Sequence, residues 1–290
     1  MTRLDQVAYP MSLIDELSAV ASERLGLKAA LSAPKIEALL RAMPEGDRAD
    51  YARRVQQEVR GGATFRAFVE ALLVHETYFF RHPDQLRLLA GDLLPSLVQA
   101  RQRAGSAELA VWCAGCSTGE EVYTIALLLQ AVIARAQEDG KDLHASILGT
   151  DVSGEAIAQA RRASFARVPG LNSFRDVPDF ARHHFTGIFR SGEGTWSPNA
   201  ELRQRVRFLE HNLVSDPAPE AGFDLILCRN TLIYFDEQGA RRALRSIEDA
   251  LRPGGVLLLG PAEMPRDDSR LVIHFTDHAV FWTKPQEGSS

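Results

Sequence analysis

Cysteine is scarce in this sequence, with three residues among 290. Three thiols cannot form the disulfide framework that holds small secreted domains together, so we expect a reducing compartment, the cytoplasm. Cys113 and Cys116 form a C-x-x-C pair, and Cys228 lies far from them along the chain. Because no fourth metal ligand is evident, we interpret all three as buried structural residues and expect no metal.

Long apolar runs and an excess of positive charge are also missing. No uninterrupted apolar run approaches the ~18 residues that cross a membrane, and charges interrupt the apolar stretch at the start of the chain. We therefore expect neither an export signal nor membrane insertion. The net charge is -5, from 33 basic and 38 acidic residues. Proteins that hold a phosphate backbone over a wide surface are usually basic, so nucleic acid is not an expected partner.

The remaining composition is that of a globular protein, with 45% hydrophobic and 24% charged residues in a chain long enough for one or two domains. Helical periodicity without strand signals extends from residue 1 to about residue 105. Within it, Asp47 is predicted to cap one helix. Pro83 is predicted in the first turn of another, where its missing N–H costs nothing.

Short apolar runs alternate with amphipathic segments from Glu108 onward. The order strand, helix, strand, helix over 108–163 predicts a parallel sheet with helices on its faces. Further strands are predicted within 206–213, 223–230, 255–260 and 278–284. The last should be antiparallel, because no crossover helix precedes it. Between 165 and 200 the alternation stops, and FTGIFRSGEGTW predicts an inserted β-hairpin.

The first candidate site is the motif VWCAGCSTGEE, in which a strand leads through Gly115 and Gly119 into a helix. Glycine lets the backbone approach a ligand closely, and the start of a helix offers free N–H groups. Ser117 stands where the dinucleotide fingerprint G-x-G-x-x-G has its middle glycine, which disfavours a pyrophosphate ligand. A tight turn that binds nothing is the alternative for this motif alone.

Asp151 ends the next predicted strand, ILGTD. A carboxylate at the carboxyl edge of a parallel sheet can accept both hydroxyl groups of a ribose, although capping the following helix is a serious alternative. Together with the glycine turn, Asp151 favours a nucleoside ligand without a pyrophosphate. S-adenosylmethionine is the commonest such ligand.

Arg229 and Asn230 follow the strand FDLILC and should emerge at the same edge as Asp151. For Asn230 alone, the alternative is a helix cap. The motif N-P-P-Y, expected at this strand end in enzymes that methylate base or amide nitrogens, is absent. Its absence argues against a nitrogen acceptor.

Taken in order, HETYFFR, VWCAGCSTGEE, GTDVS, FLEHNL and CRNTLIYF resemble the CheR family of chemotaxis protein-glutamate O-methyltransferases over nearly the whole chain. The resemblance implies an α/β fold, a Rossmann-like class I methyltransferase sheet. It implies a helical N-terminal domain (1–80) and a methyltransferase domain (81–290), with a small antiparallel β-subdomain inserted at about 165–200.

The resemblance also implies a set of residues that line the S-adenosylmethionine pocket. These are His75, Thr77, Arg81, Glu120 or its neighbour Glu121, Asp151, Asn212, Leu213, Arg229 and Asn230. Tyr234 is implied close to the methyl group. We assign Arg81 to the methionyl carboxylate, sharing a helix face with Thr77 if that segment is helical, and Tyr234 to orientation of the acceptor.

The implied activity is methylation of glutamate carboxylates on a chemoreceptor, giving the methyl ester and S-adenosylhomocysteine without a metal. The expected partner is the cytoplasmic helices of that receptor, the β-subdomain is a candidate for a receptor-tail peptide, and we expect a monomer. A non-catalytic module that senses S-adenosylmethionine is the alternative, and a small-molecule methyltransferase is a third hypothesis.

Three features depart from the family pattern. His75 replaces the usual Asn, and GPAEM replaces a G-H-S-E-N type strand end while retaining Glu263. Residues 1–75 hold ten basic and ten acidic residues, so this region lacks the positive charge with which relatives grip acidic receptor helices. The acceptor is therefore expected to be a divergent receptor.

Overall fold

The computed structural model describes residues 12–59, 61–140, 142–167, 179–190, 193–265 and 269–286. These residues form two compact units. Among the described residues, the helical unit comprises those within 12–73 together with Tyr234–Ala240, and the sheet unit comprises those within 74–233 and 241–286.

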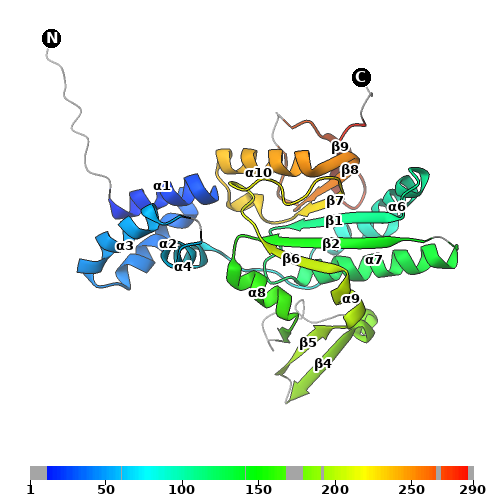
Figure 1. The fold of residues 1–290 in the computed structure, drawn as a ribbon, viewed down its shortest axis with the longest axis horizontal. Helices are drawn as coiled ribbons and strands as arrows, with labels where there is room; N and C mark the ends of the chain where they lie inside the picture. Colours follow the sequence, from blue (N-terminus) through cyan, green and yellow to red (C-terminus); the bar gives the residue numbers. More distant parts are fainter. Residues whose placement is uncertain are drawn as a thin grey trace, which may run out of the picture. The chain divides into compact units, whose positions relative to one another are not determined.

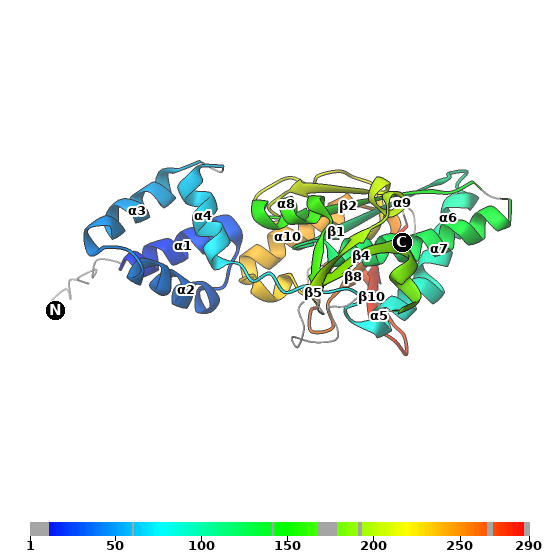
Figure 2. The ribbon, with the colours of Figure 1, turned by 90° about the horizontal axis from the view of Figure 1, so that it is seen from below.

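The helical unit contains four helices that pack around one another (Figure 2). They are α1 (Leu13–Leu25), α2 (Ala29–Arg41), α3 (Glu45–Gln57) and α4 (Ala63–Leu72). Ser12 caps α1 in a capping box with Asp15, which satisfies N–H groups of the first turn. The prediction that Asp47 caps a helix is wrong. Helix α3 begins earlier, after Pro44, whose fixed φ suits the residue before a helix.

A short segment distant in sequence, Tyr234–Ala240, completes the helical unit. The Lys28 N–H donates to the Tyr234 carbonyl at 3.0 Å. The Asp236 N–H donates to the Gly26 carbonyl at 2.7 Å, and the Ser22 hydroxyl donates to the Asp236 carboxylate at 2.5 Å. The chain therefore leaves the sheet unit just after Ile233, binds the turn between α1 and α2, and returns through α10.

The sheet unit is built on seven strands in the order β6-β2-β1-β7-β8-β10-β9 (Figure 1). The strands are β1 (Glu108–Ala114), β2 (His144–Asp151), β6 (Val206–Glu210), β7 (Phe223–Cys228), β8 (Leu251–Leu259), β9 (Val272–Phe275) and β10 (Val280–Thr283). The first five in the order are parallel, and β10 is antiparallel to both β8 and β9. The predicted parallel sheet and the predicted antiparallel last strand are both confirmed.

Helices cover this sheet. They are α5 (Pro83–Leu88), which continues through a π-helical turn (Leu89–Leu93) into α6 (Leu94–Arg103), then α7 (Glu120–Glu138), α8 (Gly154–Arg162), α9 (Ala200–Gln204) and α10 (Glu237–Ala250). Helices α6 and α7 lie side by side (Figure 2). Pro83 is the first residue of α5, as predicted. Among the described residues, no helix is long and apolar enough to cross a membrane.

Side-chain alternation along the central strands places the core of the sheet unit. Val111 and Cys113 of β1 join the main hydrophobic cluster with Leu225 and Leu227 of β7. Trp112, between them in sequence, points to the other face and is also fully buried. Since both faces of these strands are covered, their sequences are continuously apolar, as parallel strands usually are.

The insertion forms a separate antiparallel sheet of three strands in the order β3-β5-β4. They are β3 (Phe165–Arg167), β4 (Phe185–Arg190) and β5 (Glu193–Pro198), and a 3₁₀ helix (Asp179–His184) precedes β4. The β4–β5 hairpin confirms the prediction, and β3 is a strand that the sequence pattern did not predict. Of the turn expected at 191–194, Glu193 and Gly194 belong to β5, and residues 191–192 lie outside the described residues. Phe79 packs edge-on against Phe165 and Phe185, with ring centres 5.0 and 5.3 Å apart. The insertion is thus tied to the segment that contains Arg81.

Candidate functional site

The glycine turn between β1 and α7 is held by backbone hydrogen bonds to the neighbouring strand. The N–H groups of Gly115 and Cys116 both donate to the Thr150 carbonyl at 2.8 Å. Gly115 has φ +76°, and a Cβ there would lie 2.3 Å from the Thr231 hydroxyl oxygen. Position 115 therefore needs glycine both for its backbone conformation and for space.

Asp151 connects this turn to the end of β2. Its Oδ2 accepts the Ser117 N–H at 2.8 Å, and its Oδ1 accepts the Ser153 N–H at 2.9 Å. Ser153 is the residue that caps α8, through a hydrogen bond from the Ala156 N–H. The helix-capping alternative for Asp151 is therefore wrong, and its carboxylate fixes two turns at the carboxyl edge of the sheet.

Arg229 is a buried charged residue at this edge, with 1% of its side chain exposed. Its Nη1 pairs with Glu121 Oε2 at 2.5 Å, its Nε donates to Gln85 Oε1 at 2.8 Å, and its Nη2 donates to the Arg81 carbonyl. Gln85 in turn donates to the Leu259 carbonyl at 2.7 Å. All three guanidinium nitrogens thus bond to the protein, and Arg229 joins α5, α7, β7 and the end of β8.

Asn230 follows in the left-handed conformation, with φ 59°. It caps no α-helix, because α10 begins only at Glu237, so that alternative is also wrong. Its N–H donates to Glu263 Oε2 at 2.7 Å, and its side-chain oxygen lies 2.8 Å from His82 Nε2. Burial lowers the pKa of His82, and this hydrogen bond partly offsets that effect.

The segment from His75 to Arg81 is not helical, so the shared helix face of Thr77 and Arg81 is wrong. His75 is exposed and Thr77 is half-buried. The Arg81 Nη1 donates to the Glu76 carbonyl at 2.8 Å, and its guanidinium lies 5.5 Å from the centre of the Tyr78 ring. Its Nε is buried and has no hydrogen-bond partner among the described residues.

Asn212 and Leu213 follow β6 and are both buried. Their segment is anchored beside Asp151, because the N–H of His211 donates to the Asp151 carbonyl at 2.8 Å. The Asn212 side-chain oxygen accepts the Val214 N–H at 2.9 Å, which shapes the loop locally. The structure thus brings Asn212 and Asp151 to one sheet edge.

Glu120 and Tyr234 do not follow a strand of the sheet directly, unlike Asn212, Leu213, Arg229 and Asn230. Glu120 begins α7, and its carboxylate accepts the Thr118 hydroxyl at 2.7 Å. Its neighbour Glu121 makes the ion pair with Arg229 described above. Tyr234 is half-buried and belongs to the helical unit, so its role beside the methyl group stays a prediction.

The three cysteines are fully buried, and burial raises the pKa of each thiol well above its usual value. They are therefore kept as neutral thiols, the inert state of a structural cysteine. In the part of the chain that the structure describes, no group of three His, Cys, Asp or Glu side chains could hold a metal ion.

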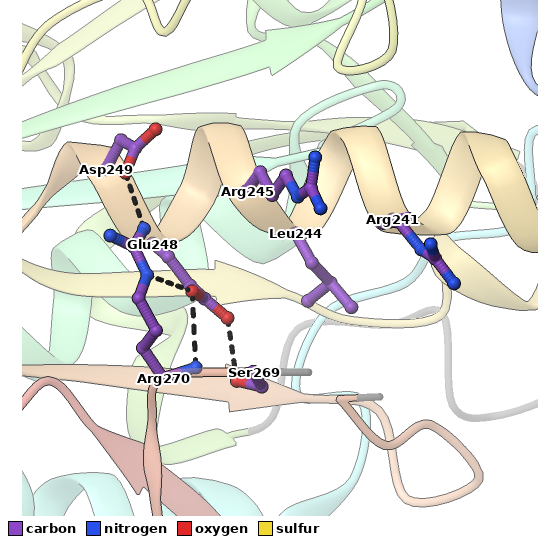
Figure 3. Close-up of a pocket in the computed structure, with 7 residues that line it drawn as sticks. All are labelled: Arg241, Leu244, Arg245, Glu248, Asp249, Ser269 and Arg270. Carbon is purple, nitrogen blue, oxygen red and sulfur yellow. Dashed lines mark hydrogen bonds and ion pairs between the residues drawn. The ribbon is translucent and has the colours of Figure 1, made fainter. Parts of the chain in front are cut away.

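A surface cavity of about 380 Å³ lies against α10, away from these residues (Figure 3). It is lined by Arg241, Leu244, Arg245, Glu248, Asp249, Ser269 and Arg270. Glu248 is buried there and accepts hydrogen bonds from Ser269 Oγ at 2.6 Å and Arg270 Nε at 3.2 Å. None of the predicted site residues lines this cavity.

Sequence reasoning missed three residues of the site: His82, Gln85 and Glu263. Gln85 is 4% exposed and Glu263 is 5% exposed. A polar residue one turn inside a helix that begins at a proline gives no signal of its own, because its partner Arg229 is 144 positions away in sequence. For Glu263, the available signal in the sequence was that GPAEM keeps this glutamate although the rest of the strand end departs from the family pattern.

The family model of the CheR methyltransferase, SAM binding domain, matches residues 75–279. The chain belongs to this family. CheR-family membership identifies the cofactor, because the matched domain is the one that binds S-adenosylmethionine. S-adenosylmethionine is the cofactor of this chain.

The chain is also similar to individual relatives, two of which are named as methyltransferases. Chemotaxis protein methyltransferase 2 of Vibrio cholerae is 31% identical over 232 residues, which cover 79% of this chain and 76% of that protein. An uncharacterized 104.1 kDa protein of Rhodobacter capsulatus is 42% identical over 193 residues, 66% of this chain and 19% of that protein. The probable biofilm formation methyltransferase WspC of Pseudomonas putida is 34% identical over 251 residues, 83% of this chain and 54% of that protein. The chain thus spans about a fifth and about half of the last two relatives.

Proposed function

We propose that this chain transfers the methyl group of S-adenosylmethionine to glutamate side chains of a receptor protein of the kind that CheR-family enzymes methylate. The observation that supports this proposal most is that the polar residues expected at the carboxyl edge of the sheet are all present. The glycine turn, Asp151, and the Arg229–Glu121 pair occur together within the matched family domain. A chain that had lost cofactor binding would have no need to retain this arrangement.

The residues present suit S-adenosylmethionine. The Asp151 carboxylate is a natural acceptor for ribose hydroxyls, and the Ser117 hydroxyl on the adjacent turn is buried without a partner among the described residues. The buried, unpartnered Arg81 Nε suits the methionyl carboxylate, since a guanidinium pairs well with a carboxylate. We propose that His75, Thr77, Glu120, Glu121, Asn212, Leu213, Arg229 and Asn230 complete the pocket, with Arg229 and Glu121 supporting it from beneath.

When bound, S-adenosylmethionine would supply an activated methyl group: a carboxylate oxygen could attack the methyl carbon in line, the C–O bond of the ester forming as the C–S bond breaks, with a neutral thioether as the leaving group. The acceptor glutamate is already ionised near neutral pH, so the protein needs no general base. Its task is to orient the two reactants and to exclude water from the carboxylate. We propose that Arg81 fixes the cofactor tail and that Tyr234 orients the acceptor without acting as a base.

The receptor that accepts the methyl group is proposed to differ from the usual chemoreceptors. The first 75 residues have equal numbers of basic and acidic residues, so the helical unit offers no net attraction to an acidic helix. The relatives include a chemotaxis protein methyltransferase and a probable biofilm formation methyltransferase. We propose that the chain acts as a monomer, and that an outer strand of the small sheet, β3 or β4, is a candidate site for a receptor-tail peptide.

The experiment is incubation of the protein with S-adenosylmethionine labelled in its methyl group and with membranes rich in receptors. The proposal predicts label on a receptor that mild base releases, because esters hydrolyse and N-methyl groups do not. Bound cofactor with no transfer to any acceptor would support the non-catalytic sensing module. Label in a small molecule would support the third hypothesis. Asp151→Ala serves as the control for label that does not depend on the site.

A further inference from the structure

Three backbone N–H groups converge on one buried carboxylate, that of Glu263, which is 5% exposed. Its Oε2 accepts the N–H groups of Gly260 and Asn230, each at 2.7 Å, and its Oε1 accepts the N–H of Ile233 at 3.1 Å. Hydrogen bonds to a charged acceptor are stronger than those between neutral groups, so the Glu263 carboxylate holds these three backbone positions firmly together.

The three donors belong to the ends of two neighbouring strands. Gly260 directly follows β8, whereas Asn230 and Ile233 follow β7, which is parallel to β8. Glu263 therefore closes the carboxyl ends of both strands with one side chain. In addition, Asn230 has φ 59°, in the left-handed region that Asn adopts more readily than most residues with a Cβ.

The turn that Glu263 holds carries the polar groups of the proposed cofactor site. Asn230 places its side-chain oxygen 2.8 Å from His82 Nε2. Arg229, one residue earlier, places its guanidinium on Glu121, Gln85 and the Arg81 carbonyl. A change in the turn would move these contacts together, because they start from two consecutive residues.

We infer that Glu263 is a positioning residue for cofactor binding, acting through the backbone of residues 229–233. This inference rests on the proposed placement of the cofactor at Asp151, Arg229 and Asn230. Glu263 itself has its carboxylate occupied by backbone N–H groups, so its effect on the cofactor passes through the turn.

Gly260 supports the inference independently. A Cβ at position 260 would lie 2.6 Å from Glu263 Oε2 and 2.8 Å from the Asn230 nitrogen. The carboxylate and the Asn230 backbone thus occupy the space that any larger residue would need. Gly260→Ala should therefore disturb the two hydrogen bonds that Oε2 accepts, although it leaves the carboxylate in the chain.

Glu263→Gln is the more conservative change. Its single carbonyl oxygen can keep at most the two N–H groups that Oε2 accepts, and its NH₂ group then faces the Ile233 N–H, donor against donor. Glu248→Gln is the matched control. Glu248 is an equally buried carboxylate of the sheet unit, with polar partners Ser269 and Arg270 in the cavity of Figure 3, and it holds no part of the proposed site.

The test is calorimetric binding of S-adenosylhomocysteine to the full chain, with the melting temperature and amide hydrogen exchange measured on each variant. We expect Glu263→Gln and Gly260→Ala each to weaken binding roughly tenfold or more. The Asn230 and Ile233 amides should exchange faster in both variants. The double variant should lose less than the two single losses together, because both changes disrupt one cluster. Glu248→Gln should lower the melting temperature and leave affinity unchanged.

Unchanged affinity in Glu263→Gln, or an equal loss in Glu248→Gln at a similar melting temperature, would overturn the inference. If a variant does not fold, the exchange and affinity of the other one decide. Because this measurement uses no methyl acceptor, it is independent of the receptor. A protein that binds S-adenosylhomocysteine but methylates no glutamate would refute the proposed function and leave the positioning role testable.

Discussion

Arg229 and Glu121 form an ion pair with 2.5 Å between Nη1 and Oε2, and their side chains are 1% and 12% exposed. The pair joins the end of β7 to the first turn of α7, two of the elements that carry predicted cofactor residues. Burying two charges is costly, and a buried pair is stabilising only while both partners remain. Removing one partner should therefore cost the protein more stability than the intact pair contributes.

Replacing Arg229 alone should be strongly destabilising. We expect Arg229→Met to lower the free energy of unfolding by about 3 to 5 kcal/mol, because it leaves Glu121 charged and without its cation in a largely buried position. Urea denaturation measures this loss. Glu121→Gln combined with Arg229→Met should recover part of it, and a double variant as unstable as the sum of the single variants would contradict the ion-pair account.

Replacing Asp151 should weaken cofactor binding. Asp151→Ala removes the proposed ribose acceptor and the partner of the Ser117 and Ser153 N–H groups. We expect a loss of about 1.5 to 3 kcal/mol in binding of S-adenosylhomocysteine, measured by calorimetry. Asp142→Ala, at an exposed position, is the control and should bind normally. Equal affinity in the two variants would remove Asp151 from the site.

The glycine turn can be tested with two substitutions of one kind. Gly115 and Gly140 have similar positive φ angles, +76° and +70°, but a Cβ would meet Thr231 at position 115 and nothing within 4 Å at position 140. Both alanine variants bear the backbone strain, of order 1 to 3 kcal/mol, and only Gly115→Ala adds the steric clash. We expect Gly115→Ala to be the less stable in thermal unfolding and to lose cofactor binding. Normal binding by Gly115→Ala would show that the turn can shift without consequence.

His82 should make stability depend on pH. Burial lowers its folded-state pKa below the ordinary 6.5, with smaller contributions from Arg229 and Arg81 in the same direction and an opposing one from the hydrogen bond with Asn230. The unfolded chain therefore binds a proton more readily, so stability is full above pH 6.5 and falls as the pH drops below it. His82→Asn has no titrating group and tolerates a positive φ.

The free energies of unfolding of the native chain and His82→Asn should therefore be compared between pH 5 and 8 by denaturant titration. We expect their difference to shrink as the pH falls, because only the native chain loses stability through His82. A constant difference across this range would show that the pKa of His82 is not lowered by folding.

Much of the fold was predictable because local patterns encode it. The alternation of apolar strands with amphipathic helices from Glu108 fixes a parallel sheet, and short runs around a turn fix the β4–β5 hairpin. The strand β3 was not predictable in the same way, since three residues carry too little pattern and its partner β5 is distant in sequence. Asp47 failed as a helix cap because Pro44 starts the helix one turn earlier.

The candidate site divides along the same lines. Gly115, Asp151, Arg229 and Asn230 were predictable because each follows a strand that could be recognised, and parallel strands end at a common edge. What each residue does there depends on partners that no local pattern identifies. Asp151 accepts hydrogen bonds from Ser117 and Ser153 in two different turns, and Arg229, which follows a strand, bonds to Gln85 on α5.

The most direct measurement of the central claim is tandem mass spectrometry of receptor protein after reaction with the enzyme and S-adenosylmethionine. The account predicts a methyl group on glutamate side chains, lost on mild base treatment and absent with Asp151→Ala. A methyl group on nitrogen, or no methyl group on receptor protein although S-adenosylhomocysteine binds tightly, would contradict it.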